Sequence, residues 1–166
     1  MVLDLKLLFG SEDCSQPFGC ELDFSELELW GNRPFKTPVK VTGSVGNRST
    51  IVTLLYTAQF VLSYPCDRCA EAVEKPWLLS FEHTLVTSLN SDDGDDNYIV
   101  VENQRLDLDE LVRSDILLSL PSKLLCREDC KGLCPVCGKN LNTGDCDCNA
   151  RSIDPRLEAL KKLLDQ

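Results

Sequence analysis

Residues 51–64 read IVTLLYTAQFVLSY and form a long, regular hydrophobic pattern. Every second side chain is apolar: Val52, Leu54, Tyr56, Ala58, Phe60 and Leu62. Successive side chains of a β-strand point to opposite faces of its sheet, so this spacing places the apolar residues on one face. The segment therefore predicts a long strand that buries one face against a core.

Similar stretches lie on both sides of this strand. Apolar and polar residues alternate in residues 39–45 before it, and Gly46-Asn47 is a dipeptide typical of a tight turn. Residues 77–85 alternate after it, with His83 on the apolar side, and residues 98–101 complete the series. Alternating segments joined by short turns are typical of antiparallel pairing. We therefore predict an antiparallel β-rich domain with a curved or barrel-like sheet, and a core position for His83.

The hydrophobic spacing becomes helical after residue 105. Apolar residues within 106–120 recur on one helical face. Asp107, with Glu110 three residues later, resembles a capping box, and Pro121 cannot continue the helix. The pattern predicts one helix over residues 106–120 that packs on the sheet.

The chain divides into two parts by residue composition. We expect a β-rich domain over residues 1–121, which includes the helix, and a second domain over residues 122–166. The second domain contains a cysteine-rich module and a short helix that begins near Asp154, with Pro155 at its first position. The predicted fold class is therefore α+β.

Ten cysteines are many for a chain of this length, and six of them lie between residues 126 and 148. In a reducing compartment, clustered cysteines more often hold a metal than form disulfides. The segment Cys134-Pro-Val-Cys137-Gly138 has the shape of a zinc knuckle, in which both thiolates reach one ion. We predict one structural Zn²⁺ in a closed all-cysteine site. Its candidate ligands are Cys134 and Cys137, then Cys130 and Cys148, then Cys126 and Cys146.

A second cysteine pair, Cys66 and Cys69, lies between two predicted strands. A redox C-x-x-C pair of the thioredoxin type needs a strand-to-helix context, which is lacking here. We interpret the pair as a stapled turn, or as a contact point that presents Arg68. The sequence leaves open whether the pair joins the C-terminal cysteines. Because the chain is rich in thiols, the alternative function is that of a cytosolic thiol-redox or iron–sulfur protein.

The chain is acidic, with 17 Lys and Arg against 27 Asp and Glu and a formal net charge of −10. Such a chain is not a general polyanion binder, so we expect no DNA partner, and any RNA contact must come from a local basic patch. Residues 121–166 are the less acidic part, with eight basic and seven acidic residues. The candidate contact residues are Arg68, Arg127, Lys131 and Lys139.

Membrane and enzyme functions find little support in the sequence. No segment approaches the roughly 20 apolar residues that span a bilayer. Asp4 and Lys6 interrupt the first apolar run, unlike a secretory signal, so we expect a soluble, cytoplasmic protein. No nucleophile–base pair, defined carboxylate pair or phosphate-binding loop is evident, so we expect a protein that is not an enzyme.

Four features occur together in one order. They are Cys66-Asp-Arg-Cys69, the helical segment 106–121, the segment 130–142 followed by Cys146 and Cys148, and Asp154-Pro-Arg156. In this order and spacing the chain resembles the large ribosomal RNA subunit accumulation family, the YceD-type domain. The resemblance implies a bacterial or plastid protein needed for normal levels of large-subunit ribosomal RNA. We therefore expect a non-enzymatic ribosome-biogenesis factor that binds this RNA, or a ribosomal or assembly protein.

Overall fold

The computed structural model describes residues 1–88 and 98–148. The chain forms two compact units. The first consists of Met1–Tyr64 and Val73–Ser122, and the second joins Pro65–Ala72 to the chain from Lys123 onward. Residues 65–72 belong to the second of these units, whereas the predicted boundary after residue 121 puts them in the first domain. The predicted helix near Asp154 lies outside the described residues.

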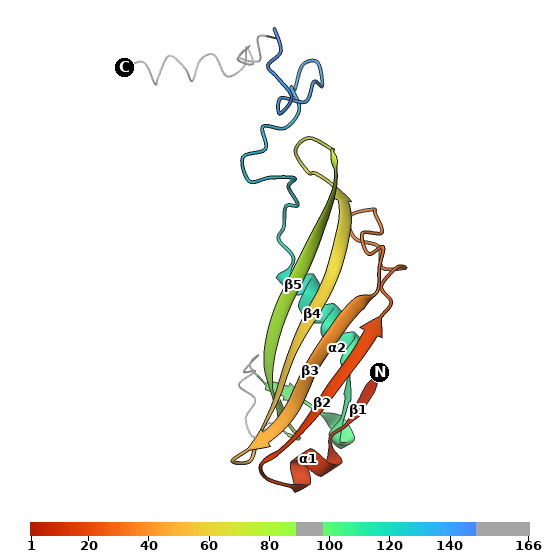
Figure 1. Cartoon of the computed structure of the whole chain (residues 1–166), viewed down its shortest axis with the longest axis vertical. Coiled ribbons are helices and arrows are strands. Elements are labelled where there is room, and N and C mark those ends of the chain that lie inside the picture. The colour runs from red at the N-terminus through yellow and green to blue at the C-terminus, as the bar shows by residue number, and fades with distance from the viewer. Residues whose placement is uncertain (89–97, 149–166) are drawn as a thin grey trace, which may run out of the picture. The chain divides into compact units, whose positions relative to one another are not determined.

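Among the residues that the structure describes, the main sheet has five strands in the order β2-β3-β4-β5-β6, as Figure 1 shows for the first four. Their bounds are β2 Cys14–Leu22, β3 Val39–Arg48, β4 Ile51–Pro65, β5 Ala72–Val86 and β6 Tyr98–Val100. Strands β2, β3 and β4 pair antiparallel, and β6 pairs parallel with β5. The α+β class and the mostly antiparallel sheet are confirmed. The barrel-like closure is not supported, because β2 and β6 are the edges of an open sheet in the described residues.

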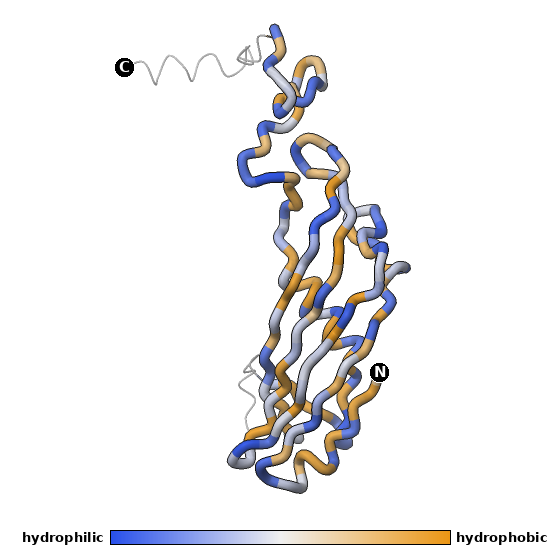
Figure 2. Tube along the Cα trace, in the orientation of Figure 1, coloured by the Kyte–Doolittle hydropathy of each residue, from blue (hydrophilic) through white to orange (hydrophobic). Residues whose placement is uncertain are grey.

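The core of the first unit lies on one face of β4, where the sequence places it. All six alternating apolar residues of this strand are at most 3 % exposed. Figure 2 shows the alternation of apolar and polar residues along the strands. The ring of Phe35 lies 5.5 Å from that of Phe60 and 5.7 Å from that of Phe24, which extends the core beyond the sheet.

The turn between β3 and β4 lies at Ser49 and Thr50, both with positive φ angles of 51° and 68°. The prediction of a turn at Gly46-Asn47 is therefore wrong, since both residues lie within β3. Asn47 is 5 % exposed, and its side-chain amide donates to the Leu8 carbonyl at 2.7 Å. This bond ties β3 to the short helix α1 (Lys6–Gly10), so the asparagine serves a tertiary contact rather than a turn.

The helix α2 (Leu108–Ser119) belongs to the first unit and buries Leu108, Val112 and Ile116. It follows a small antiparallel sheet of β1 (Val2–Asp4) and β7 (Arg105–Asp107), which the 3₁₀ turn η1 (Glu102–Gln104) precedes. Asp107 is the N-cap residue, and its carboxylate accepts from the Asp109 N–H at 3.1 Å. The cap predicted from the sequence therefore sets where the helix begins. No helix in the described part of the chain has the length and hydrophobicity needed to cross a lipid bilayer.

Candidate metal centres

Eight of the ten cysteines form two clusters of four, and both clusters lie in the second unit. The first cluster, as we name it, consists of Cys66, Cys69, Cys126 and Cys130. The second cluster consists of Cys134, Cys137, Cys146 and Cys148. Within each cluster all sulfur atoms lie within 4.8 Å of one another, and every cysteine is a free thiol. Each set therefore offers four sulfur ligands to one ion.

Both C-x-x-C pairs adopt the same local turn. The Ala70 N–H donates to the Cys66 carbonyl at 2.8 Å, and the Gly138 N–H donates to the Cys134 carbonyl at 2.9 Å. The two donor residues have positive φ angles of 57° and 73°. This left-handed residue lets the chain fold back while both sulfur atoms of the pair point inward. The Cys66–Cys69 turn is thus a second copy of the predicted knuckle.

Hydrogen bonds hold residues 65–72 against the chain after α2. The Asp67 N–H donates to the Leu124 carbonyl at 2.9 Å, and the Leu124 N–H donates to the Asp67 carboxylate at 2.6 Å. The Leu133 N–H donates to the Arg68 carbonyl at 3.1 Å. These bonds bring two distant pairs of cysteines together to form the first cluster.

The second cluster is local in sequence. Leu133 and Asn140 form an isolated antiparallel bridge, so residues 133–140 make a small hairpin around the knuckle. The Cys134 N–H donates to the Lys139 carbonyl at 2.9 Å. Cys146 and Cys148 complete the site from the loop that follows. The second cluster therefore closes within 15 residues, from 134 to 148.

The thiols of the first cluster differ in how readily they ionise. Burial acts to raise the pKa of Cys66, but backbone N–H groups of Cys126, Arg68 and Cys69 outweigh it and lower the pKa to about 6. Burial raises the pKa of Cys126 to about 12, and its thiol neighbours add to the effect. One thiol is thus prepared as a thiolate while its neighbour resists ionisation. A bound cation favours the thiolate form of both.

The second cluster shows the same division. The N–H groups of Cys137 and Val136 lower the pKa of Cys134 to about 6. The Val136 nitrogen lies 3.4 Å from the Cys134 sulfur. A hydrogen bond with Cys137, together with burial, raises the pKa of Cys148 to about 12. Four sulfur ligands with N–H support suit a tetrahedral thiophilic ion such as Zn²⁺.

The structure groups the predicted ligands differently from the sequence. Cys134, Cys137, Cys146 and Cys148 come together, and all four were candidates. Cys130, which we expected beside Cys134, lies with Cys126 in the other cluster. The sequence left open whether Cys66 and Cys69 join the C-terminal cysteines, and in the structure they lie with Cys126 and Cys130. The available signal was the C-x-x-C spacing that both knuckles share.

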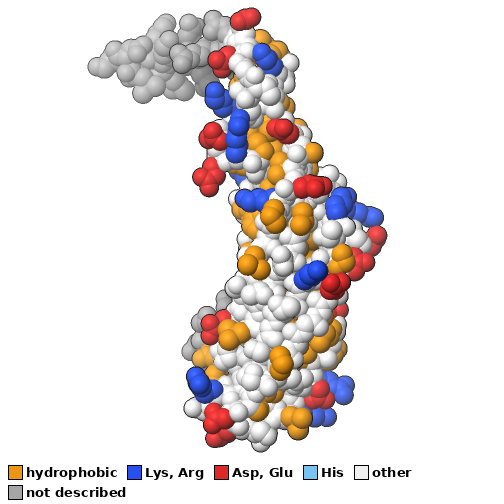
Figure 3. All heavy atoms as spheres, viewed as in Figure 1, with side chains coloured by type: hydrophobic (Ala, Val, Ile, Leu, Met, Phe, Trp, Pro, Cys, Tyr) orange, Lys and Arg blue, Asp and Glu red, His pale blue; other side chains and the backbone are white. Residues whose placement is uncertain are grey.

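The four candidate contact cations all belong to the second unit and are exposed. Arg68 donates from Nη1 to the Cys130 carbonyl at 2.8 Å, and Arg127 Nε lies 3.5 Å from an Asp129 carboxylate oxygen. Lys139 Nζ donates to the Asp145 carbonyl at 2.6 Å. Lys131 has no side-chain partner among residues 1–88 and 98–148. Basic and acidic side chains are therefore interspersed, as the face drawn in Figure 3 shows.

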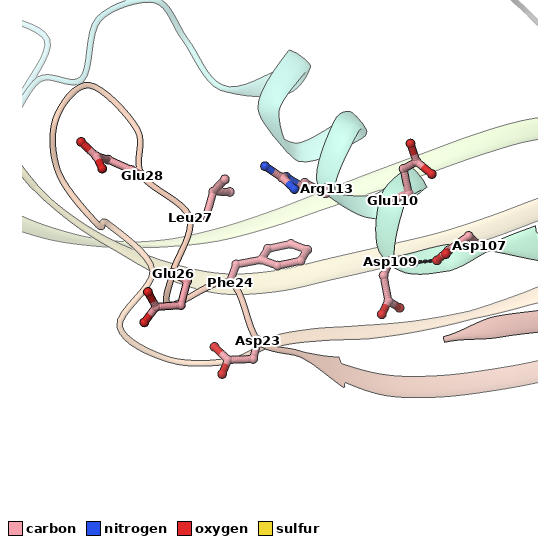
Figure 4. A pocket seen from close by; sticks show the side chains of 9 residues that line it. All are labelled: Asp23, Phe24, Glu26, Leu27, Glu28, Asp107, Asp109, Glu110 and Arg113. Carbon is pink, nitrogen blue, oxygen red and sulfur yellow. Dashed lines mark hydrogen bonds between the residues drawn. The ribbon is translucent and has the colours of Figure 1, made fainter.

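An acidic pocket of about 680 Å³ lies in the first unit (Figure 4). It is lined by Asp23, Phe24, Glu26, Leu27, Glu28, Asp107, Asp109, Glu110 and Arg113. Six of these nine residues are carboxylates, and Arg113 is the one cation of the lining. Within the described ranges, only the cysteine clusters bring metal-ligating atoms close enough for an ion. The negative charge of the pocket would attract a basic molecule. Its carboxylates are not grouped closely enough to coordinate a metal ion.

His83 contributes to a polar contact beneath α2. Its Nε2 lies 2.6 Å from an Asp115 carboxylate oxygen, which also accepts from the Tyr56 hydroxyl. The His83 and Asp115 side chains are 21 % and 12 % exposed. Burial and the hydrogen bond to Asp115 raise the pKa of Tyr56 far above its usual range, so its hydroxyl remains a donor. The three side chains therefore join β4, β5 and α2.

Comparisons with known proteins cover most of the chain. The profile of the family described as "Large ribosomal RNA subunit accumulation protein YceD" matches residues 54–164. Bacillus subtilis (strain 168) has a relative, "Uncharacterized protein YlbN", that is 31% identical over 131 residues, which are 78% of this chain and 76% of the relative. No solved structure matches the chain.

Two plant proteins are also similar, and both are named "Large ribosomal RNA subunit accumulation protein YCED homolog 1, chloroplastic". The Zea mays protein is 27% identical over 158 residues, which cover 76% of this chain and 54% of the relative. The Arabidopsis thaliana protein is 26% identical over 164 residues, which cover 80% of this chain and 50% of the relative. The chain thus spans about half the length of these plant relatives. Since the match covers about two thirds of the chain, including both cysteine clusters, most of β4, β5, β6 and α2, the chain belongs to the YceD family of large ribosomal RNA subunit accumulation proteins.

Proposed function

We propose that this protein supports the accumulation of large-subunit ribosomal RNA in the cytoplasm by binding, without catalysing a reaction. The observation that carries the proposal is the family match over residues 54–164, which includes both cysteine clusters. A four-thiolate metal site has no open position for substrate, which supports a structural rather than a catalytic role. The family is named for ribosomal RNA accumulation and not for an enzymatic activity.

The second cluster holds a structural Zn²⁺ in this proposal. Cys134, Cys137, Cys146 and Cys148 are its ligands. The ion fixes the backbone of the hairpin at residues 133–140, and this hairpin carries Lys139 and follows Lys131. The lysines are therefore presented from a rigid loop, which reduces the entropy lost when a partner binds.

The proposed partner is large-subunit ribosomal RNA, contacted by Arg68, Arg127, Lys131 and Lys139. All four are exposed, and all lie on the loops that carry cysteines. Phosphate contacts by such side chains release counterions, so binding to the RNA should weaken steeply as salt rises. The acidic pocket supports a different partner, a basic ribosomal or assembly protein, which is the alternative outcome of the test.

The test reverses the charge of all four cations to Glu in cells that lack the native protein. We expect a lower ratio of large-subunit to small-subunit ribosomal RNA. A matched control reverses Lys36, Lys40, Arg48 and Lys75, which are exposed residues of the first unit. This control changes the net charge by the same amount and should leave the ratio unchanged.

Arg68 and Lys139 also donate hydrogen bonds within the second unit, so the fourfold variant must retain its metal and its circular dichroism spectrum. The double variant Arg127→Glu/Lys131→Glu keeps both of these bonds and should lower the RNA ratio to a smaller degree. A normal ratio in a folded fourfold variant would exclude this contact surface. The acidic pocket and a basic protein would then become the next candidates.

The alternative function is that of a thiol-redox or iron–sulfur protein, and the eight clustered thiols are the observation that favours it. Purified protein distinguishes the two functions directly. A zinc protein is colourless, whereas an iron–sulfur protein is brown and contains inorganic sulfide. A colourless protein with zinc and no sulfide supports the structural role.

A further inference from the structure

Cys66, Cys69, Cys126 and Cys130 bring four sulfur atoms together from two segments that lie far apart in the sequence. We propose that this first cluster binds a Zn²⁺ ion of its own, so that each chain holds two ions. The total of two rests on the zinc ion proposed above for the second cluster, but not on the role in ribosomal RNA accumulation, because it concerns the metal content of the isolated protein. It also changes the function of the Cys66–Cys69 turn from a staple to half of a metal site.

The sulfur–sulfur distances match those around a single tetrahedral ion. The Cys66 and Cys130 sulfur atoms are 3.8 Å apart, and those of Cys69 and Cys126 are 3.7 Å apart. A tetrahedron with Zn–S bonds of about 2.3 Å has edges of about 3.8 Å. A disulfide needs a sulfur–sulfur distance of about 2.05 Å. The first cluster therefore has the dimensions of a zinc site and not of two disulfides.

The same distances argue against an iron–sulfur cluster with several irons. In such a cluster the thiolates bind different irons, and sulfide ions lie between the irons. The ligands must then stand farther apart than around one ion. All four sulfur atoms here lie within 4.8 Å of one another, which leaves space for a single ion between them.

Three of the four cysteines of the first cluster are buried, Cys126 is partly exposed, and hydrogen bonds support the cluster. Cys66, Cys69 and Cys130 are 2 %, 5 % and 2 % exposed. The Asn142 side-chain amide lies 3.3 Å from the Cys130 sulfur, and its oxygen accepts from the Lys131 N–H at 2.8 Å. A donor that is itself held in place stabilises a thiolate ligand and orients it toward the ion.

The second unit has almost no hydrophobic core to hold these loops in place. Among its described residues, Leu124 is the one buried large apolar side chain apart from the cysteines. A unit without a core needs another source of folding energy, and metal binding supplies it in small cysteine-rich modules. The first cluster links residues 65–72 to residues 123–130, a link that the second cluster cannot make because all its ligands lie beyond residue 133.

The test measures zinc in the full-length protein purified from cells grown with zinc. Native mass spectrometry and elemental analysis should give two zinc ions per chain. Titration of the metal-free, reduced protein with Co²⁺ should raise the thiolate-to-metal absorption until two equivalents are bound. Alkylation should leave the thiols of both clusters unmodified in the zinc form and modify them after chelation.

Variants assign the ions to the clusters. Cys66→Ser/Cys69→Ser should retain one ion, and Cys134→Ser/Cys137→Ser should also retain one. The control Cys14→Ser/Cys20→Ser changes two free thiols on β2 outside the clusters and should retain two. The alkylation pattern of the unaltered protein needs no variant, so it decides the question if a variant fails to fold.

Three results with the unaltered chain would overturn the proposal. These are one zinc ion per unaltered chain with alkylation of Cys66, Cys69, Cys126 and Cys130, iron with inorganic sulfide in place of zinc, or a mass that shows disulfides within the first cluster. Two ions retained by the Cys66→Ser/Cys69→Ser variant would overturn it equally. A protein with one zinc ion can still support ribosomal RNA accumulation. A failure of the two-ion proposal can therefore be distinguished from a failure of the proposed function.

Discussion

The two knuckles differ at one residue that determines how easily each turn forms. Gly138 and Ala70 occupy the same left-handed position, with φ angles of 73° and 57°. Glycine adopts this conformation freely, whereas a residue with a Cβ atom is strained there by about 1–2 kcal/mol. Ala70 therefore occupies a strained position. Hydrogen bonds between residues 65–72 and the chain near Leu124 hold it there.

Gly138→Ala should weaken metal binding at the second cluster. A Cβ atom at this position meets nothing within 4 Å, so the cost is the backbone strain alone. About 1 kcal/mol corresponds to roughly fivefold weaker zinc binding in a chelator competition assay. Gly10→Ala is the control, because a Cβ atom there is also free of contacts and the backbone is not left-handed. Equal zinc affinities in the two variants would show that the left-handed conformation at residue 138 does not affect zinc binding.

Helix α2 is fastened to the sheet by a polar contact as well as by its apolar face. The Asp115 carboxylate on α2 accepts from Tyr56 on β4 and lies beside His83 on β5. A buried carboxylate that loses a hydrogen-bond donor destabilises the fold, because its charge is left without a partner. The contact therefore fixes the position of the helix along the strands.

Tyr56→Phe should lower the free energy of unfolding by about 1–2 kcal/mol at pH 7, measured by urea denaturation. The pKa of Tyr56 is raised in the folded state, so its contribution is complete below the unfolded pKa of about 10 and is lost as the pH rises above it. The unaltered protein should therefore lose stability at pH 10.5 relative to pH 8, and the variant should lose less. Tyr98→Phe, at an exposed residue, is the control. Equal pH dependence in the unaltered protein and the Tyr56→Phe variant would contradict this role.

Elements that depend on local sequence could be predicted, and those that depend on distant partners could not. The alternation of β4 and the Asp107 cap of α2 are local, and both are confirmed. Gly46-Asn47 has the residues of a turn, but Asn47 bonds to the Leu8 carbonyl 39 residues away and remains in β3. The parallel pairing of β6 with β5 is likewise set by the two strands together, and the residue pattern of either strand alone does not indicate it.

At the scale of the whole molecule, the two units are stabilised by different means. The first has a core built on β4, and the second has its cysteine clusters and Leu124 among the described residues. The sequence predicted a cysteine-rich module, because six of its cysteines are close in the chain. It could not divide them into two sites, because Cys66 and Cys69 reach Cys126 and Cys130 only through the fold.

Removal of zinc by a chelator should unfold the second unit and leave the first intact. Trypsin should then cleave rapidly at Lys123, Arg127 and Lys131, while Lys40 and Arg48 in β3 remain protected by strand pairing. Digestion followed by mass spectrometry gives the order of cleavage, and re-addition of zinc should restore protection. If β3 were cleaved at the same rate as the second unit, the two units would unfold as one.

The spacing of the first cluster has a consequence for synthesis of the chain. Cys69 and Cys126 are 57 residues apart, so at 5–20 residues per second the ribosome needs roughly 3–11 s to make the second pair after the first. During this interval a nascent chain carries only half of the ligands. Completion of the first cluster therefore waits until Cys130 has been made, and a chain truncated before Cys126 retains an unmatched pair of thiols open to oxidation.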